Sequence, residues 1–321
     1  MPSTSPLPPA AAGIIEAEGL GRAFGELWAV RGLTLKVRRG EVFGLVGPDG
    51  AGKSTIIRML TGILPPTEGV ATVAGFPIEG GEEQIKTRIS YMSQRFGLYG
   101  DLTVEENLRF YGDLYEVPRR ERGPLEERLL GFSNLTPFRK RLASNLSGGM
   151  KQKLGLACAL IHKPEVLFLD EPTNGVDPAS RRDFWRILYA MLKEGVTVFV
   201  STAYLDEAER CSRVGLMHGG RMIQCDTPQR LKQGIPGLLV ELEAGQPRAA
   251  LEILSGRFDS GHVSLFGGKL HLYADGEDEV TQARTALREA GIEVLGAKTI
   301  PPTLEDVFIH QVTHTLQEAG S

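Results

Sequence analysis

Residues Gly47-Pro48-Asp49-Gly50-Ala51-Gly52-Lys53-Ser54 match the phosphate-binding pattern G-x4-G-K-[ST], and Thr55 follows them directly. The match lies between an apolar segment, 41–46, and a helical pattern, 55–60, which is the strand–loop–helix context that this motif requires. Glycines allow backbone N–H groups to turn toward an anion. Lys53 can then reach the β- and γ-phosphates, and the Ser54 hydroxyl can bind Mg²⁺. The sequence therefore predicts a nucleotide-binding loop in an α/β domain.

A second apolar segment, 166–170 (VLFLD), ends in two adjacent carboxylates, Asp170 and Glu171. Continuous apolar runs such as this one and 196–200 (VTVFV) are typical of strands buried on both faces of a parallel sheet. A buried strand gains no stability from two carboxylates at its end. We therefore expect Asp170 to hold Mg²⁺ through water and Glu171 to orient or deprotonate an attacking water.

A second glycine-rich turn, Leu146-Ser147-Gly148-Gly149-Met150-Lys151-Gln152, runs into another helical pattern. A small kinase or GTPase needs only one such loop. Taken by itself, Ser147 is more simply interpreted as the N-cap residue of that helix. With the two preceding motifs, however, the chain resembles the nucleotide-binding subunit of an ATP-binding-cassette (ABC) transporter. The resemblance implies that Ser147, Gly148 and Gly149 cover the γ-phosphate of ATP bound to a second subunit, in a head-to-tail dimer.

The resemblance assigns roles to three further residues. Phe24 matches the aromatic side chain that stacks on adenine, with a core aromatic as the alternative. Gln94 matches the glutamine that touches Mg²⁺ and the catalytic water, with a surface amide as the alternative. Asp177 matches the loop that crosses the dimer interface, with a turn-forming aspartate as the alternative. The implied catalytic set is Glu171, Lys53 and Gln94, and the implied metal set is Ser54, Gln94 and Asp170.

One position departs from the family pattern. The family normally has a histidine near the γ-phosphate shortly after the strand that follows the catalytic glutamate, and Ala203 stands at that position here. The hydroxyls of Thr202 and Tyr204 flank the gap, and compensation by one of them is the alternative to slow hydrolysis. Loss of a donor that stabilises developing charge costs about 10² to 10³ in rate. We therefore expect slow basal hydrolysis.

The chain divides into three parts by composition. Residues 1–13 carry four prolines and no periodic pattern, which predicts a flexible tail. In 14–236, short apolar runs alternate with helical patterns, which predicts the nucleotide-binding domain with a helical subdomain at about 95–160. Residues 237–321 carry six basic and 13 acidic residues, and their pattern predicts a small accessory α+β domain. The end of this domain, 302–308, resembles drug-export ATPases of the daunorubicin-resistance kind.

Overall composition excludes several classes of protein. The chain has 321 residues, 36 basic and 40 acidic, so its net charge of −4 gives no reason to expect nucleic acid as a partner. Three scattered cysteines exclude a disulfide scaffold and indicate a reducing compartment. No apolar run approaches the roughly 20 residues that span a bilayer. With these features, the resemblance to an ABC transporter subunit implies a peripheral protein at the cytoplasmic face of the membrane.

Together these features predict an ATP-binding and hydrolysing subunit that powers an exporter of drugs or other small molecules. Its cofactors are ATP and Mg²⁺, and its partners are a polytopic membrane subunit and a second nucleotide-binding subunit, identical or different. Two alternatives stay open: an ABC ATPase not tied to transport, and an ATP-gated dimer clamp whose hydrolysis is very slow because of Ala203.

Overall fold

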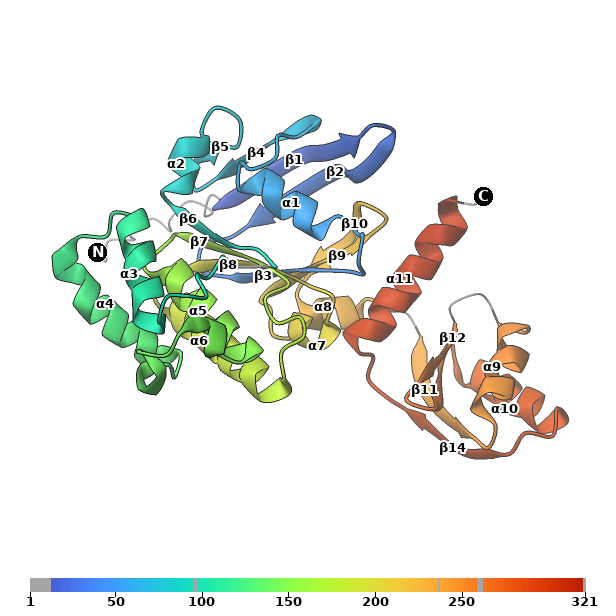
Figure 1. The fold of residues 1–321 in the computed structure, drawn as a ribbon. Coiled ribbons are helices and arrows are strands. Elements are labelled where there is room, and N and C mark those ends of the chain that lie inside the picture. The colour runs from blue at the N-terminus through green and yellow to red at the C-terminus, as the bar shows by residue number, and fades with distance from the viewer. Residues whose placement is uncertain (1–12, 95–96, 236, 259–261, 320–321) are drawn as a thin grey trace, which may run out of the picture. The chain divides into compact units, whose positions relative to one another are not determined.

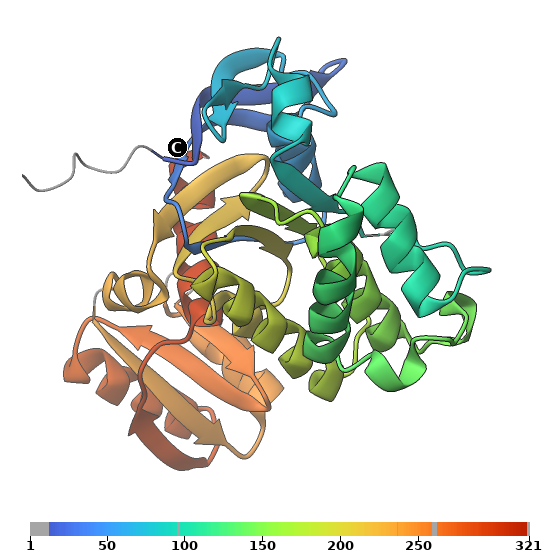
Figure 2. The ribbon, with the colours of Figure 1, turned by 90° about the vertical axis from the view of Figure 1, so that its left-hand side faces the viewer.

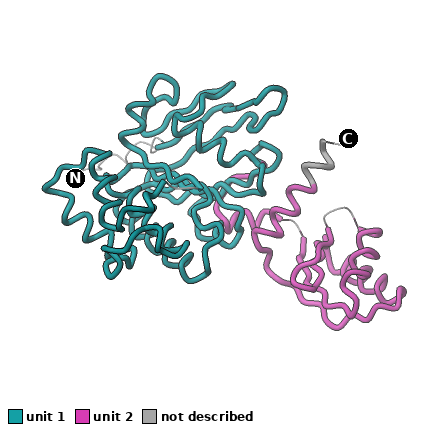
Figure 3. Tube along the Cα trace, in the orientation of Figure 1, with its two compact units in different colours: residues 1–222 teal, residues 223–321 magenta. Residues whose placement is uncertain are grey.

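The computed structural model describes residues 13–94, 97–235, 237–258 and 262–319, with the last six of these as backbone only. Of the tail predicted at 1–13, residues 1–12 lie outside the described residues, as do 95 and 96 of the predicted helical subdomain. The chain forms two compact units, 1–222 and 223–321 (Figure 3). The sequence placed the boundary between the domains at 236/237, whereas the structure places it at 222/223. Most of strand β10 (Arg221–Asp226) and all of helix α8 (Pro228–Gln233) lie between these two positions.

A six-stranded sheet with the order β10-β9-β3-β8-β7-β6 forms the centre of unit 1, and its edge strand β10 belongs to unit 1 only at residues 221 and 222. Its further strands are β3 (Val42–Val46), β6 (Ile89–Met92), β7 (Val166–Asp170), β8 (Thr197–Thr202) and β9 (Arg213–His218). The strands β3, β7 and β8 run parallel, and every residue of each is buried. This confirms the parallel sheet expected from the apolar runs. The parallel arrangement brings the carboxyl ends of these strands to one edge of the sheet.

The first strands of unit 1 form a separate antiparallel sheet with the order β2-β1-β4-β5. They are β1 (Ile15–Phe24), β2 (Leu27–Val37), β4 (Glu68–Val73) and β5 (Phe76–Pro77). Our expectation that strands alternate with helices from residue 14 onward was wrong for this part. A tight turn at Gly25, whose φ is +62°, joins β1 directly to β2, so no helix fits between them.

The helices of unit 1 surround the six-stranded sheet. Helix α1 (Lys53–Leu60) contacts β2 and β4 of one sheet and β7 of the other, while α5 and α6 lie on the opposite side of the six-stranded sheet (Figures 1 and 2). The remaining helices of the unit are α2 (Glu82–Lys86), α3 (Val104–Leu114), α4 (Arg119–Phe132), η1 (Thr136–Phe138), η2 (Ala143–Asn145), α5 (Gly148–Leu160), α6 (Pro178–Lys193) and α7 (Leu205–Ala208). The helices α3, α4 and α5 pack on one another and make up the helical subdomain.

Unit 2 has a core of its own. Its antiparallel sheet has the order β12-β13-β11-β14, with β11 (Leu238–Ala244), β12 (Val263–Phe266), β13 (Lys269–Ala274) and β14 (Val294–Thr299). Helices α9 (Pro247–Ser255) and α10 (Glu277–Glu289) bury one apolar face of this sheet, and α11 (Leu304–Ala319) follows β14. The segment 237–321 thus contains both strands and helices, as its sequence pattern predicted. No helix among the described residues is both long and apolar enough to span a bilayer.

A buried asparagine stabilises the helical subdomain. The Asn107 side chain of α3 is fully buried, and its Oδ1 accepts a hydrogen bond from Tyr99 N at 3.0 Å. Its Nδ2 donates to the carbonyl oxygens of Tyr99 at 3.0 Å and Thr103 at 2.9 Å. Buried backbone groups that lose their partners destabilise a fold. This one amide therefore ties the segment before α3 to the helix.

We predict that Asn107→Ala lowers the free energy of unfolding by about 1 to 3 kcal/mol, because it removes the hydrogen bonds of a buried amide and leaves the backbone N–H of Tyr99 without its acceptor. Urea unfolding followed by circular dichroism measures this change. Lys86→Ala on helix α2 is the control: its exposed ion pair with Glu83 is worth less than about 1 kcal/mol. Equal unfolding midpoints for the two variants would contradict the role of Asn107.

Candidate nucleotide-binding site

The loop 47–52 joins the end of β3 to the start of α1, and two of its glycines have no room for a side chain. A Cβ at Gly47 would lie 2.3 Å from the Met217 carbonyl oxygen, and one at Gly52 would lie 2.4 Å from that of Ala29. Gly52 also has a φ of +98°, in the left-handed region that favours glycine. Because the N-cap residue of α1 is Gly52, no side chain caps the first N–H groups of the helix. These N–H groups form an anion site at the start of the helix.

Lys53 lies inside this loop. Its Nζ donates to the carbonyl oxygens of Gly47 at 2.7 Å and Pro48 at 2.9 Å, and it lies 3.1 Å from Oε1 of Glu171. Both side chains of the Lys53–Glu171 pair are almost fully buried. The structure therefore brings together the cation and the carboxylate that the sequence predicted from two separate motifs.

Asp170 is a buried carboxylate that joins three elements. Its Oδ1 accepts hydrogen bonds from Ser54 Oγ of α1 at 2.9 Å and from Ser201 Oγ of β8 at 2.7 Å, and its Oδ2 lies 3.4 Å from the Tyr91 hydroxyl of β6. Burial and the neighbouring Asp170 carboxylate raise the pKa of the Tyr91 phenol, so the phenol stays protonated and can donate. The predicted metal residues Ser54 and Asp170 are thus in direct contact.

Sequence reasoning missed the roles of Tyr91 and Ser201. Ser201 is the partner of Asp170 in the register of the adjacent parallel strands β7 and β8, so its role becomes visible only once that register is known. Nothing in the sequence pattern distinguished Tyr91 from other residues of its strand.

Glu171 has a strained backbone, with φ at +48°. This conformation costs a non-glycine residue about 1 to 2 kcal/mol. The backbone N–H of Glu171 donates to the carbonyl oxygen of Ser201 at 3.1 Å and to its Oγ at 3.0 Å, which holds the residue in place. Gln94 Nε2 donates to Glu171 Oε2 at 3.0 Å. Glu171 therefore contacts both Lys53 and the exposed side chain of Gln94, so these three side chains form one cluster.

A hollow of about 140 Å³ lies beside Glu171 and Ala203. Its wall also includes Asp49, Thr173, Asn174, Thr202 and Tyr204. An apolar cavity of about 150 Å³ can hold benzene, so the hollow has room for an imidazole ring.

The two hydroxyls that flank Ala203 have partners of their own. Thr202 Oγ1 donates to Glu207 Oε2 at 2.9 Å, and the Tyr204 hydroxyl lies 3.3 Å from Asn174 Oδ1. Glu207 is fully buried and also accepts a hydrogen bond from Thr173 Oγ1 at 2.5 Å. The Thr202 hydroxyl therefore donates its hydrogen to Glu207 and does not replace the missing histidine.

Phe24, at the end of β1, is 49% exposed, which excludes the core aromatic considered from the sequence. The guanidinium of Arg22 lies 4.9 Å from the centre of its ring. An exposed ring of this kind presents a face on which a planar group can stack.

The remaining predicted residues form a second cluster at the start of α5 and α6. Ser147 caps α5 by accepting from Met150 N at 3.3 Å, and Asp177 caps α6 by accepting from Ala179 N at 3.1 Å and Ser180 N at 2.9 Å. The backbone hydrogen bond from Ser180 lowers the pKa of Asp177. A Cβ at Gly149 would lie 2.4 Å from Ser180 Oγ, so the glycine allows the two helices to approach.

Ser147, Gly148 and Asp177 are exposed, and the contacts described for this second cluster do not include the loop 47–52. The helix-capping role considered from the sequence for Ser147 is therefore present in the structure, and Asp177, for which the alternative was a turn-forming aspartate, also caps a helix. They leave the exposed side of the cluster available to another molecule.

Comparisons with known proteins show which family the chain resembles. The ABC transporter family profile matches residues 30–174. The "Probable multidrug ABC transporter ATP-binding protein YbhF" of Escherichia coli is 44% identical over 219 residues, which are 68% of this chain and 38% of that protein. This chain therefore matches about two fifths of the length of that relative.

Two further relatives match over nearly the whole chain. The "Nod factor export ATP-binding protein I" of Neorhizobium galegae is 37% identical over 92% of this chain and 84% of its own length. The "Linearmycin resistance ATP-binding protein LnrL" of Bacillus subtilis is 32% identical over 95% of this chain and 100% of its own length.

Solved structures show the same fold. An ATP-binding subunit of an ABC transporter has a TM-score of 0.63 and 29% identity, over 68% of this chain and 92% of its own. The cbiO1 protein of Clostridium perfringens, part of the ABC transporter complex cbiONQ, has a TM-score of 0.64 and 27% identity, over 70% of this chain and 92% of its own. The chain therefore belongs to the ABC transporter family, as one of its ATP-binding proteins.

Proposed function

We propose that this protein hydrolyses ATP and supplies the energy for a membrane exporter of drugs or other small molecules. The observation that carries the proposal is the single cluster formed by Lys53, Ser54, Gln94, Asp170 and Glu171. Relatives whose names state multidrug transport, Nod factor export and linearmycin resistance support the export of a small molecule.

The P-loop residues bind the phosphates in this proposal. The N–H groups at the start of α1 receive phosphate oxygens, and Lys53 Nζ exchanges contacts with Gly47 and Pro48 for contacts with the β- and γ-phosphates. Phe24 stacks on the adenine ring. The proposed phosphate-binding residues are Gly47, Pro48, Asp49, Gly50, Ala51, Gly52, Lys53, Ser54 and Thr55.

The donor set beside the loop fits Mg²⁺. The Ser54 hydroxyl, the Asp170 carboxylate and the Gln94 amide offer oxygen atoms, which are the ligands that Mg²⁺ prefers. Ser54 Oγ and Asp170 Oδ1 already lie 2.9 Å apart. When bound there, Mg²⁺ would neutralise charge on the phosphates.

Glu171 is the proposed general base. Its carboxylate takes a proton from water as the water oxygen bonds to the γ-phosphorus, and the bond from that phosphorus to the bridging oxygen breaks with its electron pair leaving on ADP. Gln94 orients the carboxylate through the 3.0 Å hydrogen bond to Oε2. The strained backbone at Glu171 fits this role, since such strain clusters at functional sites.

A second nucleotide-binding subunit completes the site in this proposal. Ser147, Gly148, Gly149 and Asp177 would meet the ATP bound by the P-loop of that subunit, and the exposure of Ser147, Gly148 and Asp177 supports this role. The second subunit is either identical to this one or a different one. A polytopic membrane subunit, with this protein at its cytoplasmic face, would convert the closing and opening of the dimer into transport.

Ala203 favours a second candidate, a dimer clamp that binds ATP but hydrolyses it very slowly. The hollow beside Glu171 holds no imidazole, and the Thr202 hydroxyl is bound to Glu207. Both candidates bind ATP in the same way and differ in their rate of hydrolysis.

We predict that Glu171→Gln retains ATP binding and lowers the steady-state rate of hydrolysis by about 10² to 10⁴, because an amide cannot accept the proton from water. With ATP and Mg²⁺, the variant should accumulate as a dimer on gel filtration. Glu83→Gln, at an exposed carboxylate paired with Lys86, is the control and should keep the wild-type rate. A wild-type rate in Glu171→Gln would exclude Glu171 as the base.

We predict that Ala203→His raises the rate of ATP hydrolysis by about 10-fold to 10³-fold, because it restores a donor near the γ-phosphate. Ala203→Leu fills the same hollow without a donor and should not raise the rate. Both variants are measured beside wild type at saturating ATP and Mg²⁺. A brisk wild-type rate that Ala203→His leaves unchanged would show that this position does not limit hydrolysis and would exclude the clamp.

A further inference from the structure

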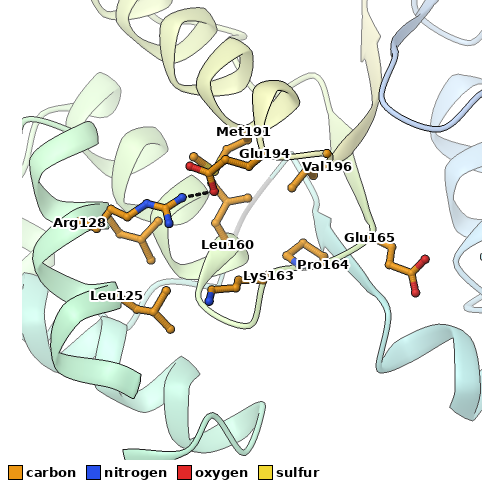
Figure 4. A pocket seen from close by; sticks show the side chains of 11 residues that line it. Leu125, Arg128, Leu160, Lys163, Pro164, Glu165, Met191, Glu194 and Val196 are labelled. Carbon is orange, nitrogen blue, oxygen red and sulfur yellow. Dashed lines mark ion pairs between the residues drawn. The ribbon is translucent and has the colours of Figure 1, made fainter. Parts of the chain in front are cut away.

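A second cavity, of about 230 Å³, lies at the edge of the central sheet opposite the nucleotide site (Figure 4). Glu165 and Val196, which immediately precede β7 and β8, line it, whereas Asp170 and Thr202 end the same strands at the other edge. The cavity is therefore separate from the nucleotide site.

The cavity also lies at the far ends of the helices that begin at the second cluster. Leu160 is the last residue of α5, which Ser147 caps, and Glu194 is the C-cap of α6, which Asp177 caps. Helix α4 of the helical subdomain closes the remaining side through Leu125 and Leu129. An occupant would thus contact helices α5 and α6 and the residues that precede strands β7 and β8. These four elements lead to site residues 147, 177, 170 and 202.

Apolar side chains form most of the cavity wall. Leu125, Leu129, Leu160, Met191 and Val196 come from four different parts of the chain, and each is at most 9% exposed. A dry cavity of about 150 Å³ lined by such residues holds benzene. A cavity of 230 Å³ has room for a ring of that size with a short chain.

The charges around this apolar wall are neutralised with one exception. Arg128 of α4 pairs with Glu194 at the end of α6, as the dashed line in Figure 4 marks. Glu165 accepts from Arg39 at 2.8 Å and Arg88 at 2.6 Å, and the hydrogen bond from Arg39 is the main cause that lowers the pKa of its carboxyl group. Within the described ranges of the chain, Lys163 alone among these charged lining residues has no ion pair.

The backbone at Lys163 gives a second reason to consider this side chain. Its φ is +53°, a left-handed conformation just after the end of α5, where glycine has the lower conformational cost. A lysine at this position also interacts favourably with the partial negative charge at the C-terminus of α5. That interaction does not account for the apolar cavity beside the lysine. Figure 4 shows the Lys163 ammonium group near Leu125 and Leu160.

We propose that this cavity binds a small amphipathic carboxylate, with its apolar part against the leucines and its carboxylate on Lys163. The apolar wall selects a ring or short chain, and the unpaired ammonium at its rim selects a negative group. The site lies outside the nucleotide-binding residues, so the proposal does not rest on the proposed ATP hydrolysis.

Titration calorimetry with 4-phenylbutyrate on the full chain without nucleotide tests the proposal. We expect one molecule bound per chain, and we expect Lys163→Gln to weaken binding by about threefold to tenfold, the range for one partly exposed charged contact. The uncharged 4-phenylbutanol should bind wild type and Lys163→Gln equally. Lys140→Gln, an exposed lysine outside the cavity, should leave the affinity for 4-phenylbutyrate unchanged.

Two further variants separate binding from structure. Leu125→Trp should fill the cavity and abolish binding of both compounds. Lys163→Gly should raise the thermal unfolding midpoint by relieving the backbone strain, and yet weaken binding of 4-phenylbutyrate. No binding to wild type at millimolar concentration, or equal affinity in wild type, Lys163→Gln and Lys163→Gly, would overturn the proposal. Undiminished binding to a folded Leu125→Trp would also overturn it.

Discussion

The buried carboxylate of Asp170 is the contact on which the arrangement of the site depends. A buried carboxylate needs partners, and Asp170 takes them from three different elements: Ser54 on α1, Ser201 on β8 and Tyr91 on β6. These contacts place the start of α1 against the edge of the sheet. They also hold Ser201, which in turn fixes the backbone N–H of Glu171. One desolvated charge thereby sets the positions of helix α1 and of the Glu171 carboxylate, the proposed general base, together.

Close backbone approach is the second constraint on the site. Gly47 and Gly52 each face a carbonyl oxygen at a distance that excludes a side chain, and Gly149 faces Ser180 in the same way. The two glycine-rich segments therefore need glycine for packing, apart from the phosphate binding proposed for them. Ser147 and Asp177 cap helices with their side chains and are exposed, so this structural role is compatible with the role proposed for them at a second subunit.

The long elements of unit 1 connect two regions of different chemistry. Their ends near Asp170, Ser147 and Asp177 carry polar groups and strained or glycine-rich backbone. Their other ends surround an apolar cavity, where the Arg128–Glu194 ion pair joins α4 to α6. Helices α5 and α6 each reach both regions as continuous helices.

Local patterns in the sequence were sufficient for the phosphate loop, the carboxylates that end β7, the parallel sheet and the elements of unit 2. Each of these depends on neighbouring residues or on a short period, such as the apolar run before Asp170 or the Gly267-Gly268 pair between β12 and β13. The hydrogen bonds of Tyr91, Ser201, Asn107 and Glu207, the antiparallel β1–β2 pairing and the apolar cavity were not predictable in this way. They depend on strand register and on contacts between residues far apart in the chain, which form only when the sheet and its helices have packed.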